Sequence, residues 1–268
     1  MLVDFHSHTT ESDGTLEPAA LAAMMRERGV TVYSISDHDA LGAYERHDLS
    51  GGPEKFVVGI EINSTYKDNE VHVLGYGFPL GSSELRETIE ENRRSREDRA
   101  ATMVRQLCEA GHVLTLDQVR AEAADDPALG RPHVAKALVR AGLAPSVDAA
   151  FRELLVPGKP GYVPQHYITP QRAVDVIKRA GGVPVLAHPC RLSDESLIDE
   201  LAAGGIVGLE VFYPKHDAAQ VAHYRALAER YGLVMTAGSD FHDPRWNPRG
   251  VGMEVEPADI QPFLDLVL

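Results

Sequence analysis

Short apolar runs rich in β-branched residues alternate with amphipathic segments along most of the chain. Seven runs have the length and composition of strands, and several are almost continuously apolar, as strands buried on both faces are. They cover residues 2–5, 31–36, 55–62, 71–78, 183–187, 206–213 and 233–239. Helical periodicity predicts helices between them at 17–28 behind a Thr15 cap, and at 169–180, 193–203 and 216–231.

This alternation predicts parallel strands joined by right-handed crossovers. The exception is 56–78, where two apolar runs flank the turn-like sequence KDNE and predict a hairpin. Seven strands in 268 residues fit one α/β barrel, while the length alone also allows two smaller domains.

The strand rhythm stops between residues 84 and 165. Four helical patterns follow one another there, and the Pro/Gly-rich run VPGKPGYVPQ ends them; the patterns cover 84–111, 115–124, 131–142 and 146–155. We therefore predict a helical insertion at 84–165 that divides the barrel into residues 1–83 and 166–268.

The composition is that of a globular protein, with 44% hydrophobic and 25% charged residues. No apolar run reaches the roughly 20 residues that a membrane helix needs, and the first residues lack a signal-peptide pattern. Two cysteines are too few for a disulfide framework. We expect a cytoplasmic protein without a membrane partner.

The chain is acidic, with 40 Asp and Glu against 26 Lys and Arg and a formal charge of −14. This balance disfavours binding of long nucleic acid through a broad basic face. Twelve histidines remain to be explained.

Histidine and carboxylate side chains recur where the predicted strands end. The carboxyl ends of barrel strands converge on one face, so residues far apart in sequence meet there. His72 begins its strand, but an antiparallel strand entered after Glu61 begins at that same face, and Asp13 follows the first strand closely. The set comprises His6, His8, Asp13, His38, Glu61, His72, His188, Asp240 and His242.

Imidazole and carboxylate ligands together favour Zn²⁺, Mn²⁺ or Fe²⁺ over Ca²⁺ or Mg²⁺. Nine ligands exceed the demand of one ion, so we predict two to three divalent ions with Glu61 as a bridging ligand. Asp37 and Asp39 are interpreted as residues that orient a neighbouring histidine or cap a helix. Cys190 is interpreted as packing.

The ordered motifs HSH, SDG, SDHD, GIEI, VHVLGY, AHP and SDFH closely resemble those of the polymerase and histidinol phosphatase (PHP) family over essentially the whole chain. The resemblance implies a distorted seven-stranded (β/α)7 TIM-like barrel, a trinuclear metal centre and phosphoester hydrolysis, with Glu61, His188 and Asp240 at the catalytic centre. It assigns one ion to His6, His8, Glu61 and Asp240, a second to Glu61, His72 and His188, and a third to Asp13, His38 and His242.

Such a centre supplies a metal-activated hydroxide and neutralises charge on the phosphate. The insertion resembles the lid of the PHP subgroup that hydrolyses nucleoside 3′,5′-bisphosphates and trims short oligonucleotides from the 5′ end. Arg131, His133, Lys159 and Arg191 are predicted to hold the second phosphate, and His216 is a further candidate for substrate contact.

Two other functions remain open from the sequence. One is a small-metabolite phosphatase, for example one that acts on histidinol phosphate. The other is a metal-stabilised binding or regulatory module without turnover, although all nine ligand positions are filled.

Overall fold

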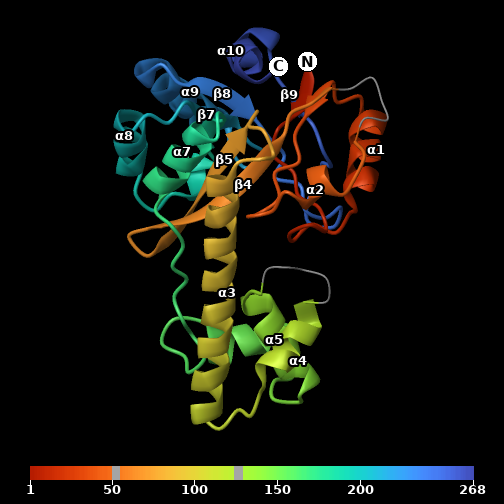
Figure 1. Ribbon diagram of the computed structural model, residues 1–268, viewed down its shortest axis with the longest axis vertical. Coiled ribbons are helices and arrows are strands. Elements are labelled where there is room, and N and C mark those ends of the chain that lie inside the picture. Colours follow the sequence, from red (N-terminus) through yellow and green to blue (C-terminus); the bar gives the residue numbers. More distant parts are fainter. Residues whose placement is uncertain (50–54, 124–128) are drawn as a thin grey trace. The chain divides into compact units, whose positions relative to one another are not determined.

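Residues 1–49, 55–123 and 129–268 are described by the structure, a computed structural model (Figure 1). The chain forms two units. Unit 1 contains Met1–Ile89 and Ile168–Leu268, and unit 2 contains Glu90–Tyr167.

Unit 1 is an α/β unit with two mixed sheets in its described residues. The first sheet has the order β3-β2-β1-β9, with β1 (Leu2–Asp4), β2 (Val32–Tyr33), β3 (Lys55–Phe56) and β9 (Met253–Glu254). The second has the order β4-β5-β6-β7-β8, with β4 (Gly59–Tyr66), β5 (Asn69–Tyr76), β6 (Val183–Leu186), β7 (Gly208–Phe212) and β8 (Val234–Ala237).

The predicted hairpin is confirmed. Strands β4 and β5 pair antiparallel from Gly59↔Tyr76 to Tyr66↔Asn69. The turn between them is tight, because Lys67 and Asp68 adopt positive φ angles of 47° and 64°. Strand β5 then pairs antiparallel with β6, and β6, β7 and β8 run parallel.

Two predicted strands differ from the structure. The run 55–62 is divided into β3 and β4, which belong to different sheets. The run 31–36 contributes a strand only at Val32–Tyr33. Beyond it the backbone still contacts the first strand segment, since Ser34 N donates to Asp4 O and Ser36 N donates to Ser7 O, both at 2.8 Å.

Backbone contacts join the two sheets at both ends. Ser7 pairs with Phe241 and His38 pairs with Glu61 in parallel bridges. Phe5 N donates to Ala237 O at 2.8 Å, next to the first bridge. The polar residues that follow β1 and β2 therefore lie beside β8 and β4.

Two helices of unit 1 begin at side-chain caps. Thr169 Oγ1 accepts from Arg172 N at the start of α7, and Asp217 with Gln220 forms a capping box on α9. Helices α7 and α9 pack against the second sheet. The helices are α1 (Pro18–Arg28), α2 (Gly42–Glu45), α7 (Pro170–Arg179), the 3-10 turn η2 (Pro189–Arg191), α8 (Ser196–Ala203), α9 (Ala218–Tyr231) and α10 (Pro257–Val267).

The predicted Thr15 cap is wrong. Helix α1 begins at Pro18, whose fixed φ angle suits the first helical position, and no side chain caps it at Glu17. Thr15 instead donates its hydroxyl to His242 O at 3.3 Å. None of the helices in the described parts of the chain is long and apolar enough to cross a membrane.

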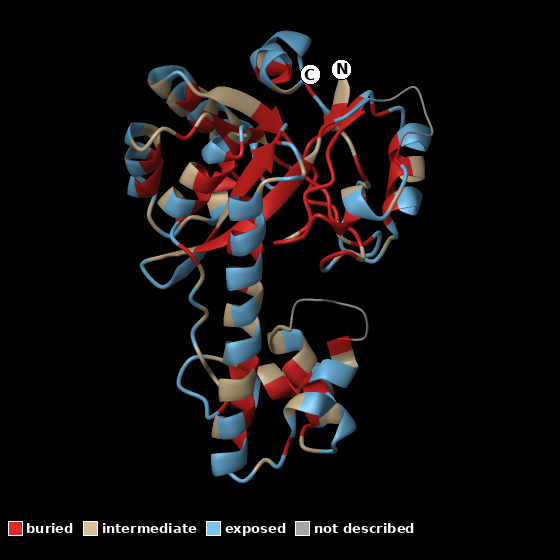
Figure 2. Ribbon diagram, in the orientation of Figure 1, coloured by how far each residue is buried: buried red, intermediate tan, exposed pale blue. Residues whose placement is uncertain are grey.

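The strands of unit 1 are largely buried (Figure 2). Apolar side chains such as Ile62, Val73 and Leu209 form the core between the second sheet and its helices. Several polar side chains are buried as deeply, including His6, His8 and Glu61, each 0% exposed. A charged group is seldom buried without a partner, so these residues mark a site.

Unit 2 is helical in its described residues. Most of helix α3 (Ser83–Glu109) lies in it, together with α4 (Leu116–Ala123), α5 (Arg131–Arg140), α6 (Val147–Ala150) and the π-helix η1 (Phe151–Leu155). The last residue of the predicted helix 115–124 lies outside the described residues. The apolar core of unit 2 includes Met103, Leu107, Val134, Leu138 and Leu155.

Candidate metal centre

The nine predicted metal ligands lie together in unit 1. His6 and His8 follow β1, His38 follows β2, Glu61 lies in β4, His72 in β5, and His188 follows β6; Asp240 and His242 follow β8, and Asp13 lies in the loop after β1. Three overlapping groups of these side chains have ligand atoms within 4.8 Å of one another.

The first group is fully buried. It contains His6, His8, Glu61 and Asp240. Both histidines place Nε2 at 3.2 Å from Glu61 Oε2 and at 3.4 Å from Asp240 Oδ1. Two imidazoles and two carboxylates around one point form a four-ligand set suited to Zn²⁺, Mn²⁺ or Fe²⁺.

The second group contains His38, Glu61 and His72; His188, which the resemblance assigned to the second ion, is in none of the three groups of the described residues but lies beside this one. His72 Nδ1 lies 2.9 Å and His188 Nε2 lies 3.2 Å from Glu61 Oε1. His38 Nδ1 lies 3.1 Å from Glu61 Oε2, so His38 reaches this carboxylate as well as the third group. Glu61 therefore faces ligands on both of its oxygens, which is the geometry of a bridging carboxylate.

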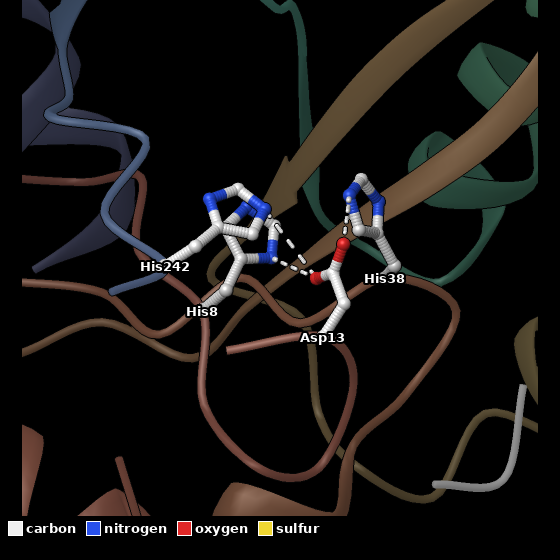
Figure 3. A group of neighbouring side chains, drawn as sticks. All are labelled: His8, Asp13, His38 and His242. Atoms are coloured by element: carbon white, nitrogen blue, oxygen red, sulfur yellow. Dashed lines mark ion pairs between the residues drawn. The ribbon is translucent and has the colours of Figure 1, made fainter. Parts of the chain in front are cut away.

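The third group is more open. His8, Asp13, His38 and His242 point toward one another, with the Asp13 carboxylate between the imidazoles (Figure 3). Asp13 Oδ1 lies 3.4 Å from His242 Nε2, and Asp13 Oδ2 lies 3.9 Å from His38 Nε2. The side chain of Asp13 is 54% exposed, whereas His8 is buried. A cation held here would lie beside this exposed carboxylate.

Buried ligand atoms without hydrogen-bond partners support a metal at this place. Both ring nitrogens of His8, His6 Nε2 and Glu61 Oε2 are buried, and no hydrogen bond to them is found within the described ranges. Such atoms are costly to bury unless something else binds them. Because the unpartnered imidazole and carboxylate atoms face one another, the donor set fits divalent cations.

The pKa values reflect the crowding of charges. Burial acts to lower the pKa of His8, but Asp240 and Glu61 outweigh it and raise the pKa to about 9. Burial is likewise outweighed at His72, where Glu61 raises the pKa to about 10. At His38 burial dominates and lowers the pKa to about 3. Burial acts to raise the pKa of Glu61, yet the imidazoles around it hold that pKa well below its usual range.

Three further carboxylates hold the ligands in place. Asp37 accepts from Thr9 N and Thr9 Oγ1, both at 2.7 Å, and so fixes the loop that carries Asp13. Asp39 accepts from Asn63 Nδ2 at 2.7 Å. Asp4 accepts from Ser239 N at 2.9 Å, next to Asp240. None of these carboxylates is in a ligand group of the described residues.

Glu210 in β7 connects two ligands from different strands. Its Oε1 lies 2.9 Å from His6 Nδ1, and its Oε2 accepts from His188 N at 2.7 Å. The second contact holds His188 at a φ angle of 25°, which a residue with a side chain rarely adopts. Glu210 is buried, and a Cβ at neighbouring Gly238 would approach its Oε1 to 2.6 Å. Only glycine fits at position 238.

A cavity of about 730 Å³ opens over the metal centre. Six of the candidate metal ligands line this cavity: Asp13, His38, His72, His188, Asp240 and His242. Its other lining residues include Glu70, Arg191, Tyr213, Lys215, Trp246 and Arg249. Arg191 Nη2 donates to Asp240 Oδ2 at 2.7 Å, and Tyr213 OH donates to the same oxygen at 2.9 Å. Arg191 is thus the one predicted substrate residue among the described residues that line this cavity.

The other predicted substrate residues lie elsewhere. His216 is not among the described residues that line the cavity; it is buried, its Nδ1 donates to Val211 O at 2.8 Å, and its ring packs near Tyr213 and Tyr224. Arg131, His133 and Lys159 belong to unit 2. Arg131 begins α5, where His133 Nδ1 accepts from Gly130 N at 3.1 Å.

Sequence patterns missed Glu210, Tyr213 and Trp246. Glu210 interrupts the apolar run IVGLEVFY, and an acidic residue inside a buried strand is a signal that could have revealed it. Tyr213 ends that same run and gives no comparable signal. Trp246 follows the last ligand motif by only four residues, yet nothing in the local pattern assigns it to the cavity.

We expect Glu210→Gln to weaken metal binding or activity by about 10- to 100-fold, the usual effect of replacing a residue that orients a metal ligand. The amide keeps the size of the side chain but places a donor opposite His188 N or His6 Nδ1. Metal dissociation constants from buffered titrations and kcat measure the effect. The exposed Glu229→Gln in α9 is the matched control, and equal metal affinity in both variants would contradict the prediction.

The chain is similar to known phosphoesterases over nearly its whole length. It is 31% identical over 258 residues to a 3′,5′-nucleoside bisphosphate phosphatase from Chromobacterium violaceum, covering 93% of this chain and 90% of that protein. It is 32% identical over 276 residues to the 5′-3′ exoribonuclease Rnm of Escherichia coli, covering 94% of this chain and 92% of that protein. A solved metal-dependent phosphoesterase from Bifidobacterium adolescentis is 32% identical to this chain, with a TM-score of 0.74. The match covers 89% of this chain and 87% of that protein. No family model matches.

Proposed function

This chain belongs to the PHP-type metal-dependent phosphoesterases, and from that premise we propose that its substrate is a nucleoside 3′,5′-bisphosphate or the 5′ end of a short oligonucleotide. Two relatives support this proposal: one is named as a 3′,5′-nucleoside bisphosphate phosphatase and the other as a 5′-3′ exoribonuclease, and they cover 93% and 94% of this chain. Neither of these two relatives is named for an activity on histidinol phosphate, the alternative substrate.

One observation in the structure carries the proposal. Unpartnered ligand atoms of His6, His8 and Glu61 face one another beside a cavity of about 730 Å³, and Arg191 lines its wall. A cavity of this size accommodates a nucleotide. Arg191 donates to the carboxylate of Asp240 through Nη2. The other N–H groups of its guanidinium can donate to a phosphate.

We propose two to three divalent ions of Mn, Zn or Fe, held by the three ligand groups. When bound, such ions acidify a water molecule and neutralise the negative charge of the phosphate. The protein's own contribution is positional. Glu61 bridges the ligand groups, Asp240 is fixed by Arg191 and Tyr213, and His188 is held by Glu210.

We also infer that the strands close into a distorted seven-stranded TIM-like barrel. The bridges Ser7↔Phe241 and His38↔Glu61 support this inference, because with them β1, β2, β4, β5, β6, β7 and β8 form an unbroken ring of neighbours. Strands β3 and β9 then remain as short edge strands outside the ring. Such a barrel gathers the carboxyl ends of its parallel strands at one face.

We further propose that unit 1 supplies the metals and that unit 2 supplies substrate choice. The sequence prediction that Arg131, His133 and Lys159 hold a second phosphate fits this role, since Arg131 lies at the start of α5 and its guanidinium group suits a phosphate.

Side-by-side turnover by metal-loaded protein tests the proposal. The panel is adenosine 3′,5′-bisphosphate, a 5′-phosphorylated trinucleotide and histidinol phosphate. We expect kcat/KM to be at least about 100-fold higher for the two nucleotide substrates, and Arg131→Ala to reduce that preference. Preference for histidinol phosphate would overturn the substrate class, and equal losses on all three substrates would overturn the role of Arg131. No phosphate release from any compound, with metal content verified, would favour a binding module.

A further inference from the structure

The loop after the last two ligands forms one wall of the cavity. The cavity is lined by five consecutive residues of this loop, Trp246, Asn247, Pro248, Arg249 and Gly250. Trp246 is 67% exposed, so its ring is accessible from the cavity. It is also the single tryptophan of the chain. A large exposed indole beside a polar metal centre calls for an explanation, because solvent exposure of so much apolar surface brings no stability.

Hydrogen bonds fix this loop directly to the metal ligands. Asn247 Oδ1 accepts from His242 N at 3.0 Å, and Asn247 Nδ2 donates to Asp240 O at 3.2 Å. Trp246 N donates to Asp243 O at 3.0 Å. The indole is therefore attached within a few residues of two side chains of the metal centre, and a ligand pays little ordering entropy to use it.

The guanidinium group of Arg245 also helps to place the indole. It lies 5.9 Å from the ring centroid, and both oxygens of Asp243 hold it. A cation at this distance interacts with one face of an aromatic ring. An indole has two faces, so the second remains for a flat ligand.

Two cations on the same cavity wall indicate that the ligand is anionic as well as flat. Lys215 and Arg249 are exposed and line the cavity with Trp246. Within the described ranges Lys215 has no carboxylate in ion-pair distance, and Arg249 Nη1 donates only to the carbonyl oxygen of Pro214, at 3.4 Å. A flat aromatic group joined to phosphate is the chemistry of a nucleotide.

We propose that Trp246 is the stacking platform for the nucleobase of the substrate. This inference rests on the proposed function and assigns the base to a named residue. Stacking on an aromatic side chain is tolerant of base identity, because every base has a flat π face. The site therefore accepts all four bases while it requires that a base be present.

The single tryptophan makes the proposal directly measurable. Fluorescence excited where tyrosine does not absorb reports on Trp246 alone. Metal-loaded protein is titrated with adenosine 5′-phosphonate, which cannot be hydrolysed, and with ribose 5-phosphonate, which has no base. We expect the adenosine compound to quench the emission saturably. The ribose compound should compete with it and reverse the quenching.

Kinetics of Trp246→Ala provide the second test. We expect KM for adenosine 3′,5′-bisphosphate to rise about 5- to 150-fold, the range that corresponds to loss of one base stack. KM for ribose 5-phosphate should be unchanged, and Trp246→Phe should restore most of the affinity. Leu266→Ala is the matched control, since it removes an exposed apolar side chain that is not among the described residues lining the cavity.

The two tests separate this inference from the proposed function. If nucleotides are hydrolysed but Trp246→Ala raises KM equally for substrates with and without a base, the platform is wrong and the function stands. If no nucleotide is hydrolysed but the adenosine compound still quenches Trp246, the platform stands and the function is wrong. Equal quenching by the ribose compound overturns the platform.

Discussion

Replacing Glu61 with glutamine is expected to lower kcat/KM for phosphate release about 1,000-fold, which corresponds to about 4 kcal/mol of transition-state stabilisation. No other described side chain faces ligand atoms from so many elements. Its Oε2 lies within 3.2 Å of His6, His8 and His38, and its Oε1 within 3.2 Å of His72 and His188. Glutamine keeps the volume of the side chain but loses the negative charge that the first and second ligand groups share. Steady-state rates and metal content per chain measure the change together.

Glu70→Gln is the control for this experiment. Glu70 also lines the cavity and lies 3.2 Å from His72 Nε2, but its side chain is 51% exposed. Solvent screens an exposed carboxylate, so the same change there should cost less than about tenfold. The bridging role of Glu61 would be disproved by a Glu61→Gln enzyme that keeps its metals and more than a tenth of its activity.

Local sequence patterns predicted the hairpin well because its information is local. Two apolar runs and a turn sequence specify the pairing of β4 with β5, and the structure confirms it. The strand over 55–62 could not be predicted correctly from periodicity. Its two halves pair with different partners, Phe56 with Tyr33 and Gly59 with Tyr76, and such a division depends on the tertiary fold.

The gathering of the nine candidate ligands was predictable for a different reason. Histidines and carboxylates recur at the ends of several predicted strands, and the carboxyl ends of such strands converge on one face, so their positions along the chain already indicated that they gather. Glu210 was not predicted, because its role depends on two contacts, to His6 and to His188 N, that join β7 to the segments following β1 and β6. The cavity wall around Trp246 likewise depends on how Asn247 attaches the loop to Asp240.

Removing the metals is expected to abolish phosphate release and to lower the melting temperature. An ion at 100 times its dissociation constant stabilises the fold by about 2.7 kcal/mol per site. Its loss leaves the carboxylates and imidazoles of the buried group facing one another without a cation. Dialysis against a chelator, then calorimetry and activity before and after addition of Mn²⁺, measures both effects, and elemental analysis should find two to three ions per chain.

The metal-free protein should also bind metal more weakly as the pH falls. A metal takes the neutral imidazole, whereas His8 and His72, with pKa values of about 9 and about 10, carry protons at neutral pH. Each proton that must leave weakens the apparent affinity about tenfold per pH unit below these values. Mg²⁺ is the control ion. Because Mg²⁺ prefers oxygen ligands over imidazole, adding it to the metal-free protein should restore less activity than adding Mn²⁺. Full activity after verified chelation, or a metal affinity independent of pH between about 6 and 8, would contradict the assignment of these imidazoles as ligands.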